Sequence, residues 1–314
     1  MGESEVPRSD RPNSGMPAWS LAGSAAVLFA TLCWTFATIS VKLADASSIW
    51  ITFWRFLIAL PLAFVLLFWH GRRHGLSHLR RGWVGGVAFA VHVLVYFSAL
   101  TLTSVAVVTF VAALTPVCIM VIAGRAFGER VTPAMVAWGG LSLVGVAIVI
   151  VGGDTGAETT AIGNALAVLN LVLWTAYFAT SKYLREDLDA VGYQGAVLIV
   201  SAVVVTPVAL VLAAAGIGVS GGQVSGTGWY WILAIAFVSS AGHLLLNWAH
   251  RFVAASLSAI IVLALPVFSA VGAALFLGEA FGPVQAAGGA LVLISTGTIV
   301  FRPNGQADYP AEDA

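Results

Sequence analysis

Three ionisable side chains stand inside long apolar stretches of the sequence: Arg55, His92 and His243. Because a charge is costly in such surroundings, each of them is a candidate for chemistry. Arg55 could bind a carboxylate through two parallel hydrogen bonds; alternatively, it could extend toward water or pair with Asp45 or a helix C-terminus. His92 and His243 could exchange a proton near neutral pH, or each could stay neutral and hydrogen-bonded to a neighbouring helix.

Two Trp-Thr dipeptides, Trp34–Thr35 and Trp174–Thr175, also stand in the middle of apolar stretches. An indole ring offers a flat apolar face and one N–H donor, so the two dipeptides could line a cavity from opposite sides and enclose a small amphipathic solute. They could equally fill the space between packed helices. Three further polar side chains are weaker candidates for the same cavity, because polar groups in apolar segments also join helices to one another: Tyr96, Asn170 and Asn247.

The composition indicates that these residues are surrounded by lipid. Of the 314 residues, 60% are hydrophobic and 9% are charged, whereas a soluble domain has about 45–50% apolar and about 25% charged residues. The net charge of zero gives no reason to expect a nucleic-acid partner. No metal-ligand spacing and no pair of nucleophile and base is recognisable, so we expect no metal, no cofactor and no enzyme activity. The sequence therefore predicts an all-α integral membrane protein.

About 20 apolar residues cross a bilayer as a helix, and the sequence divides into ten such segments. All Lys and Arg residues except Lys42 and Arg55 fall on one side of the membrane if the N-terminus is cytoplasmic, as the positive-inside rule favours. Both termini are then cytoplasmic, in a cytoplasmic (inner) membrane. His78, beside the arginines at 80 and 81, is expected at the solvated surface. The predicted spans are residues 18–43, 49–70, 82–102, 105–125, 132–152, 162–183, 190–215, 228–249, 256–277 and 283–302.

The chain contains the same five-span unit twice, in the repeats 18–153 and 162–303, with a disordered cytoplasmic tail at 1–17 and a second tail at 304–314. Because five is odd, the second copy crosses the membrane in the opposite direction, and a two-fold axis in the membrane plane relates the halves. Transporters built in this way bind their substrate near the midplane, between the halves. Matches at offsets of 140 to 150 residues pair Trp34 with Trp174, Lys42 with Lys182, Pro116 with Pro266, Gly128 with Gly278, Glu129 with Glu279 and Pro133 with Pro283.

Pro116 and Pro266 fall in the middle of the fourth and ninth predicted spans. Each removes a backbone hydrogen bond and bends its helix, which frees carbonyl groups for a solute or water. A bend that flexes would serve as a hinge, whereas a rigid bend would only shape the packing. The sequence leaves both interpretations open.

Glu129 and Glu279 each follow a glycine and precede a proline. The glycine suits the end of one helix, and Pro133 or Pro283 suits the first turn of the next helix. A carboxylate just before that turn would meet the free N–H groups of the helix that follows. We therefore predict that both glutamates are structural, each in a tight turn between two consecutive spans.

Each half carries the pattern P-x(12)-E-x(3)-P-x(5)-G, with an aromatic–Thr pair in its first span, and the first half adds FWRF around Arg55 in the second span. In these motifs the chain resembles the EamA-type branch of the drug/metabolite transporter superfamily. The resemblance implies a secondary transporter in which spans one to four and six to nine surround a central cavity, while spans five and ten are peripheral. Relatives export amino acids and other small metabolites, and more distant ones carry nucleotide sugars or triose phosphates.

We therefore expect export of small neutral or zwitterionic metabolites, such as amino acids, by alternating access. The alternatives are a carrier of phosphorylated or nucleotide-linked solutes and a sensor or scaffold that transports nothing. A phosphate dianion would require several Lys or Arg side chains in the cavity, and only Arg55 is available. The expected partners are a small-molecule substrate, the lipid bilayer and, if His92 and His243 couple transport, protons. Two complete halves form a cavity without a second chain, so a monomer is expected.

Overall fold

The computed structural model describes residues 21–70, 75–103, 105–129, 131–151, 160–185, 187–217, 224, 226–278 and 281–301. Within these residues every regular element is a helix. Ten helical segments are long and apolar enough to cross a membrane, which confirms the predicted all-α fold with ten spans. Their bounds are Leu21–Leu43, Ser48–Phe68, Gly75–Leu102, Val107–Phe127, Pro133–Val151, Ala161–Leu184, Ala190–Ala214, Gly228–Ala249, Ala255–Leu277 and Pro283–Phe301.

The third span differs most from its predicted bounds, because it begins at Gly75 rather than at position 82. The pair of arginines at 80 and 81 suggested a boundary, but the helix continues through it. Arg81 is half exposed and forms an ion pair with Asp187. A charged side chain of this kind can reach the water at the membrane surface while its backbone stays helical.

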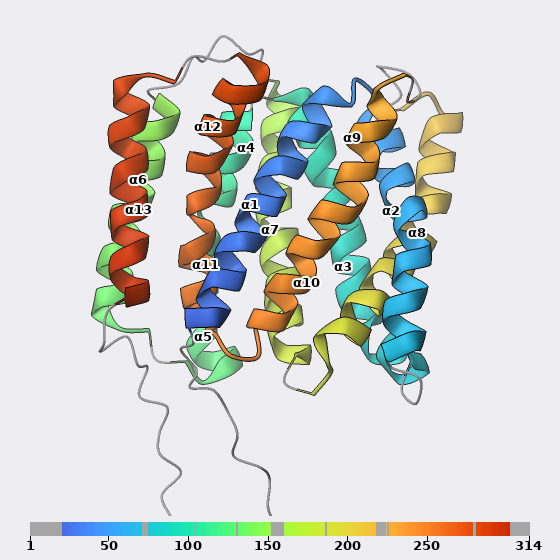
Figure 1. Cartoon of the computed structure of the whole chain (residues 1–314), viewed down its shortest axis with the longest axis horizontal. Coiled ribbons are helices and arrows are strands. Elements are labelled where there is room, and N and C mark those ends of the chain that lie inside the picture. Colours follow the sequence, from blue (N-terminus) through green and yellow to red (C-terminus); the bar gives the residue numbers. More distant parts are fainter. Residues whose placement is uncertain are drawn as a thin grey trace, which may run out of the picture.

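Each half of the chain comprises five spans in the same order, although a π-helix lies in the second span of the first half and in the third span of the second half (Figure 1). In both, the fourth span is broken into two helices just before a proline, at Pro116 and at Pro266. The first half comprises α1 (Leu21–Leu43), α2 (Ser48–Phe64) with the π-helix η1 (Val65–His70), α3 (Gly75–Leu102), α4 (Val105–Ala112), α5 (Thr115–Phe127) and α6 (Pro133–Val151). The second half comprises α7 (Ala161–Leu184), α8 (Ala190–Ala214), α9 (Gly228–Ala234) with the π-helix η2 (Ile235–Ser239), α10 (Ser240–Ala249), α11 (Ala255–Val262), α12 (Ala264–Leu277) and α13 (Pro283–Phe301).

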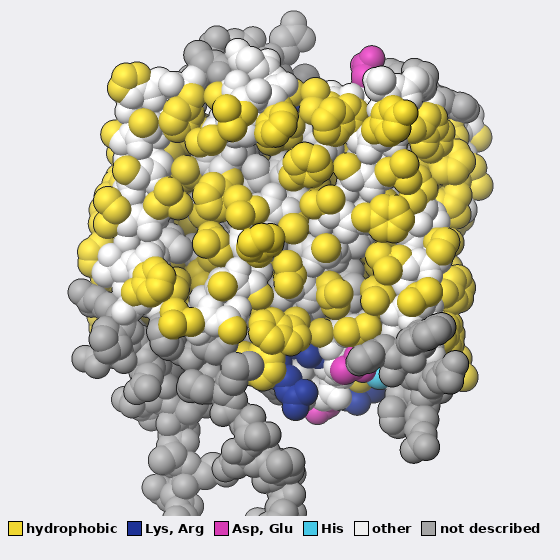
Figure 2. All heavy atoms as spheres, viewed as in Figure 1, with side chains coloured by type: hydrophobic (Ala, Val, Ile, Leu, Met, Phe, Trp, Pro, Cys, Tyr) yellow, Lys and Arg dark blue, Asp and Glu magenta, His cyan; other side chains and the backbone are white. Residues whose placement is uncertain are grey.

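Helix α1 begins, and helix α13 ends, at the lower face of the molecule in Figure 1. Each half crosses the molecule five times, so the second half starts at the upper face and is inverted relative to the first. Figure 2 shows that Lys and Arg side chains gather along the lower edge, below a broad surface of hydrophobic side chains. We call this lower face the basic face, since helix ends and loops there carry Arg80, Arg81, Arg125, Lys182, Arg185 and Arg251.

A lysine at the end of the first helix of each half joins that helix to the third span of the same half. Lys42 donates a hydrogen bond from Nζ to the carbonyl oxygen of Leu100, at 2.8 Å. Lys182 donates in the same way to the carbonyl oxygens of His250 and Val253, at 2.7 and 3.0 Å. A cation is favourable beside the carbonyl groups at a helix C-terminus. The two halves therefore repeat a three-dimensional contact, on opposite faces of the molecule, as well as a sequence pattern.

The last helices of the two halves, α6 and α13, pack against each other at one end of the molecule (Figure 1). Their backbones meet at two glycines: a Cβ atom added to Gly145 would lie 2.8 Å from the carbonyl oxygen of Gly288, and the reverse holds as well. Small residues allow this close approach of membrane helices. The pair α6–α13 thus joins the two halves at the periphery.

Glu129 also joins the two halves, and here the prediction from the sequence was wrong about its partner. Its carboxylate accepts hydrogen bonds from the backbone N–H groups of Ala255 and Ser256, at 2.5 and 3.1 Å, and from the Ser256 hydroxyl, at 2.7 Å. Glu129 therefore caps the N-terminus of α11 in the second half, rather than that of the next helix, α6. Gly128 ends α5 with a φ of 64°, and Pro133 is the first residue of α6.

The pseudo-symmetric turn begins in the same way. Gly278 ends α12 with a φ of 70°, and Pro283 is the first residue of α13. Both glycines occupy the left-handed region, which side chains with a Cβ atom adopt at a cost. Glu279 lies outside the described residues, so its predicted role remains a prediction.

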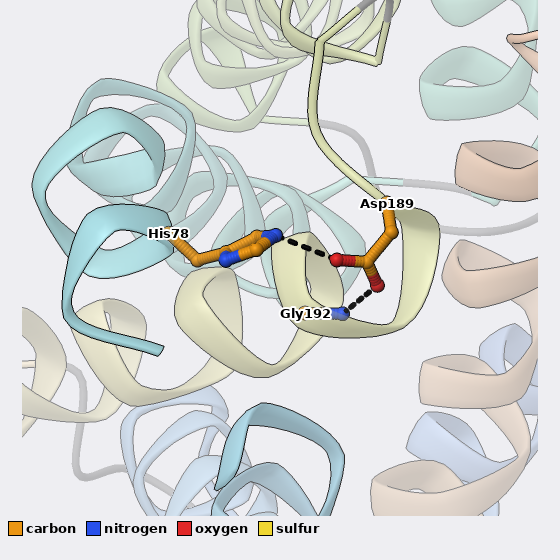
Figure 3. A network of polar contacts seen from close by, with 3 residues as sticks. All are labelled: His78, Asp189 and Gly192. Carbon is orange, nitrogen blue, oxygen red and sulfur yellow. Dashed lines mark hydrogen bonds and ion pairs between the residues drawn. The ribbon is translucent and has the colours of Figure 1, made fainter. Parts of the chain in front are cut away.

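His78 is buried rather than solvated, which corrects the expectation for this side chain. Its Nε2 atom lies 2.6 Å from the carboxylate of Asp189, the N-cap residue of α8, and the same carboxylate accepts a hydrogen bond of 2.7 Å from the N–H of Gly192 (Figure 3). Burial alone would raise the pKa of Asp189, but the Gly192 hydrogen bond and the nearby His78 and Arg185 together lower it. At the basic face this contact ties the start of α3 to the start of α8.

Candidate functional site

A cavity lies between the two halves, near the middle of the spans. It contains about 770 Å³ of space free of protein atoms, counting the part that opens to solvent. Helices α6 and α13 contribute no lining residue, as expected for peripheral spans, and neither does α8. The lining residues are Trp34, Ala37, Thr38, Arg55, His92, Val93, Tyr96, Phe97, Thr109, Ala112, Ala113, Thr115, Pro116, Asn170, Trp174, Ser239, His243, Ala259, Val262, Leu263, Leu265 and Pro266.

The two tryptophans in the first helix of each half form the centre of the cavity. Each indole ring packs against a histidine of the opposite half: Trp34 lies 4.9 Å from His243 between ring centroids, and Trp174 lies 4.9 Å from His92. The interplanar angles are 41° and 38°, so the two contacts are nearly equivalent. Four aromatic rings from both halves thus form a shared wall, which offers flat apolar faces to a bound solute.

Two hydrogen bonds position polar rings that line the cavity, those of His92 and Tyr96. Nδ1 of His92 lies 2.7 Å from the carboxamide oxygen of Asn170, a contact that requires the hydrogen of the imidazole to be on Nδ1. The hydroxyl groups of Thr38 and Tyr96 lie 3.0 Å apart. In contrast, Nδ1 of His243 has no hydrogen-bond partner among the residues that the structure describes.

Arg55 contributes the one formal charge among the lining residues, none of which is an Asp or a Glu. Its side chain is 2% exposed, and its guanidinium carbon lies 5.0, 5.3 and 5.6 Å from the ring centroids of Phe56, Phe89 and Phe97. Its Nε and Nη2 atoms have no hydrogen-bond partner within the described parts of the chain. No ion pair between Arg55 and Asp45 is formed.

The broken fourth and ninth spans line the cavity with the same five positions of each repeat. These positions are 109, 112, 113, 115 and 116 in the first half, and 259, 262, 263, 265 and 266 in the second. The breaks at Ala113–Leu114 and at Leu263 precede Pro116 and Pro266 by two or three residues. Thr115 Oγ1 donates to the carbonyl oxygen of Ala112 at 2.5 Å, and that oxygen is the one that an N–H at position 116 would otherwise bind.

Seven of the ten residues proposed from the sequence for substrate binding thus line one cavity, and three do not. Thr35 Oγ1 donates to the carbonyl oxygen of Thr31, at 3.0 Å, within α1. Thr175 is absent from the lining, although its hydroxyl has no partner among the described residues. Asn247 lies deeper, toward the basic face, and belongs to a separate polar network.

That network lies next to the cavity, about one helical turn beyond His243 toward the C-terminus of α10 at the basic face. Asn247 donates from Nδ2 to Gln194 Oε1 at 2.7 Å and accepts a hydrogen bond of 2.5 Å from Ser181. Ser181 Oγ also lies 3.0 Å from Nδ1 of His250, and Arg185 Nε donates to the carbonyl oxygen of Asn247 at 2.7 Å. Burial and, to a lesser degree, the charge of Lys182 hold the pKa of His250 well below its usual value. The network joins α7, α8 and α10.

The network was not recognised from the sequence, although a signal for it exists. At the repeat offset that pairs Trp34 with Trp174, Ala37 pairs with Tyr177. Ala37 lines the cavity, whereas Tyr177 is fully buried beneath it, next to the network. The lining therefore includes the small residue of this pair and leaves out the tyrosine. Comparing the two halves position by position would have revealed this difference.

No metal site is formed by the described residues, which contain no group of three or more His, Cys, Asp or Glu side chains that could hold an ion. Two inverted five-span halves around a central cavity define a multi-pass membrane transporter. The chain matches the EamA-like transporter family over residues 21–151 and 161–301, and it belongs to that family. Membership in the drug/metabolite transporter superfamily, expected from the sequence motifs, is thereby confirmed.

Among the proteins similar to the chain are a curated relative and a solved structure. A probable terminal-alkyne amino-acid exporter of Streptantibioticus cattleyicolor is 35% identical over 142 residues, which cover 45% of this chain and 46% of that protein, so the match spans about half the length of either. A crystal structure of another protein superposes with a TM-score of 0.69 at 22% identity, over 88% of this chain and 96% of that one. The second likeness supports the fold alone.

Proposed function

We propose that the protein exports small zwitterionic metabolites, with amino acids as the leading candidates, by alternating access. The observation that carries the proposal is the asymmetric cavity between two inverted halves. Ala37 lines the cavity, whereas its equivalent Tyr177 is buried beside the network around Asn247; we infer from this difference that the cavity is closed toward the basic face and extends toward the opposite face. A transporter needs a second state in which this closure opens and the opposite end closes. The name of the partial relative, an amino-acid exporter, supports the same substrate class.

The orientation follows from the charges. Because Lys and Arg residues are favoured on the cytoplasmic side of a membrane protein, we assign the basic face to the cytoplasm, and with it both ends of the chain. In a bacterium the membrane would be the cytoplasmic (inner) membrane. The cavity in the described conformation then extends outward, and a substrate released from it would leave the cell.

The lining favours a small, uncharged or zwitterionic solute over a phosphorylated one. A phosphate dianion binds best to several cations, and the described lining residues include one, Arg55. The four aromatic rings at the centre suit an apolar side chain. The lining comes from both halves of a single chain, so a monomer forms the complete site.

Proton coupling through His92 and His243 is a second part of the proposal. Both rings are buried, at 7% and 5% exposure, and each packs on a tryptophan of the other half. Protonation of either would place a second cation near Arg55 and would weaken binding of a cationic substrate group. Flux that follows a pH gradient would support coupling, and flux that ignores it would indicate a uniporter.

The experiment is flux of radiolabelled amino acids in proteoliposomes, with Ala37→Trp as a blocking variant. Ala37 lines the cavity, so a tryptophan there would fill it and abolish flux. Ala137→Trp is the matched control, because Ala137 is exposed on α6, outside the cavity. Absence of flux for every amino acid by the wild-type chain, or full flux by Ala37→Trp, would refute the proposal.

A further inference from the structure

The guanidinium of Arg55 is a buried charge without a counter-charge. Its Nε and Nη2 atoms find no acceptor among the described residues. The ion pairs formed by those residues are His78 with Asp189 and Arg81 with Asp187, both at the basic face. Removing a cation from water without a partner is expensive, so a site of this kind is stabilised when a ligand supplies the missing anion.

The three phenylalanine rings around Arg55 favour its charge without replacing that anion. A ring face attracts a cation, but it accepts no in-plane hydrogen bond from an N–H group. Phe56, Phe89 and Phe97 therefore hold the guanidinium in one place while its donors stay unpaired. Since Arg55 and Phe97 both line the cavity, this place is open to a solute.

The position in the second half that is equivalent to Arg55 holds a small side chain that contributes to helix packing. At the offset that aligns the second spans, Arg55 pairs with Ser201. Ser201 is fully buried and donates a hydrogen bond of 3.0 Å to the carbonyl oxygen of Gly86. The fold thus accepts a small side chain with a hydrogen-bond partner at this position, so an arginine is not required for the architecture of a half.

We propose that Arg55 is the carboxylate-binding residue of the cavity and that it restricts the occupant to monocarboxylates, amino acids among them. A carboxylate can accept two parallel hydrogen bonds from the guanidinium and neutralise its charge. The aromatic wall formed by Trp34, Trp174, His92 and His243 then contacts the rest of the solute. An amine without a carboxylate leaves Arg55 unpaired, and its own positive charge is repelled. The inference rests on the proposed function in taking this cavity as the substrate site.

The test measures binding to the purified full-length chain by thermal shift and by tryptophan fluorescence. The twenty standard amino acids are screened first, together with 4-methylpentanoate and 3-methylbutylamine, the deaminated and decarboxylated forms of leucine. The best-binding amino acid is then compared with its own deaminated acid and decarboxylated amine. We expect the amino acid and the acid to bind, and the amine to bind at least about 30-fold more weakly, as for the loss of a buried charge pair.

Two substitutions separate binding from folding. Arg55→Met keeps the length and apolar stem of the side chain and should abolish the preference for acid over amine, while Arg55→Lys should retain part of it. Neither should lower the melting temperature of the ligand-free protein by more than the Ser201→Ala control, which should bind carboxylates like the wild type. Wild-type affinity for the acid in Arg55→Met would overturn the inference, as would equal binding of acid and amine by the wild type.

Failure of this inference and failure of the proposed function give different results. If amino acids bind through Arg55 but no flux is found, the carboxylate site is supported and the proposed export is refuted. If flux is found and the Arg55→Met variant transports amino acids with unchanged KM, export is supported and the carboxylate site is refuted. If no amino acid and no simple carboxylate binds the wild type, both the proposed export and the carboxylate site are refuted.

Discussion

The indole ring of Trp34 meets that of Trp174 edge to face, with ring centroids 5.3 Å apart and an interplanar angle of 85°. The two residues are equivalent in the repeat, yet they belong to different halves, so their contact lies where the two halves meet. Any motion of one half against the other has to change this contact. Under the proposed function, the pair lies where it would contact a substrate and where a relative movement of the halves would alter it.

Trp34→Ala and Trp174→Ala should each reduce the efficiency of transport, kcat/KM, by about tenfold or more, the equivalent of about 1.4 kcal/mol. Each substitution removes one face of the aromatic wall and the contact with a histidine of the other half. Flux in proteoliposomes is the measurement, and Trp83→Ala is the control, since Trp83 is 56% exposed and outside the cavity. Full flux in both variants would show that the indoles serve packing alone.

The spans could be predicted because apolar length decides them, and the inversion could be predicted because a five-span unit recurs. The contacts between the two halves could not be predicted from the sequence. Glu129 binds α11 across 127 positions of sequence, and nothing near Glu129 in the chain indicates that partner. His78 is buried because α8 covers it through Asp189, which no local pattern around His78 reveals. Helices that are apolar on all sides carry no periodic signal for the face that meets a neighbour, so the lining of the cavity required the structure.

Asn247 illustrates a limit within the candidate site. An intramembrane amide is equally suited to bind a solute or to join helices, and the sequence could not distinguish the two. Its neighbours settle its position: it bonds to Ser181 and Gln194, and it is fully buried. Asn170, on α7, has the same side chain, yet it lines the cavity and is hydrogen-bonded to His92.

Glu129→Ala should lower the stability of the folded protein by about 1.5–3 kcal/mol, the range for hydrogen bonds to a charged group. The substitution leaves the N–H groups of Ala255 and Ser256 without their acceptor and loosens the contact between the halves. Glu129→Gln should be milder, because it keeps one acceptor oxygen. Thermal unfolding in detergent is the measurement. Substrate affinity should stay within about twofold, because Glu129 is outside the cavity.

A double-mutant cycle with Ser256→Ala makes the Glu129 prediction specific. The Ser256 hydroxyl donates to the same carboxylate, so the two substitutions should be less destabilising together than the sum of their separate effects. Additive effects would mean that the carboxylate acts elsewhere.

Asp189→Asn should lower stability at neutral pH by less than about 1 kcal/mol, because the side chain is 43% exposed and solvent screens its charge. Asparagine also caps helices well, so this substitution removes the charge and keeps the cap of α8. The pKa of Asp189 is lowered in the folded state, so its contribution is present above the unfolded pKa of 3.8 and is lost as the pH falls through the folded value. Melting temperatures of the two proteins should therefore differ at pH 7 and converge below about pH 4; a constant difference would contradict the assignment.

Tyr177→Ala should shift the protein toward a state that is open at the basic face. Tyr177 is fully buried between the cavity and the polar network, and the equivalent Ala37 leaves space on the other side. If the tyrosine contacts form only while the basic face is closed, their loss of about 1.5–3 kcal/mol would change the ratio of the two states on the order of tenfold or more.

Cysteine labelling measures this ratio, in a background from which Cys33 and Cys118 have been removed. With an impermeant maleimide, an Ala37→Cys variant should react from the face opposite the basic face. A Ser181→Cys variant should be protected until Tyr177→Ala is added, and it should then react from the basic face. Unchanged protection of position 181 would show that Tyr177 is not part of the closure.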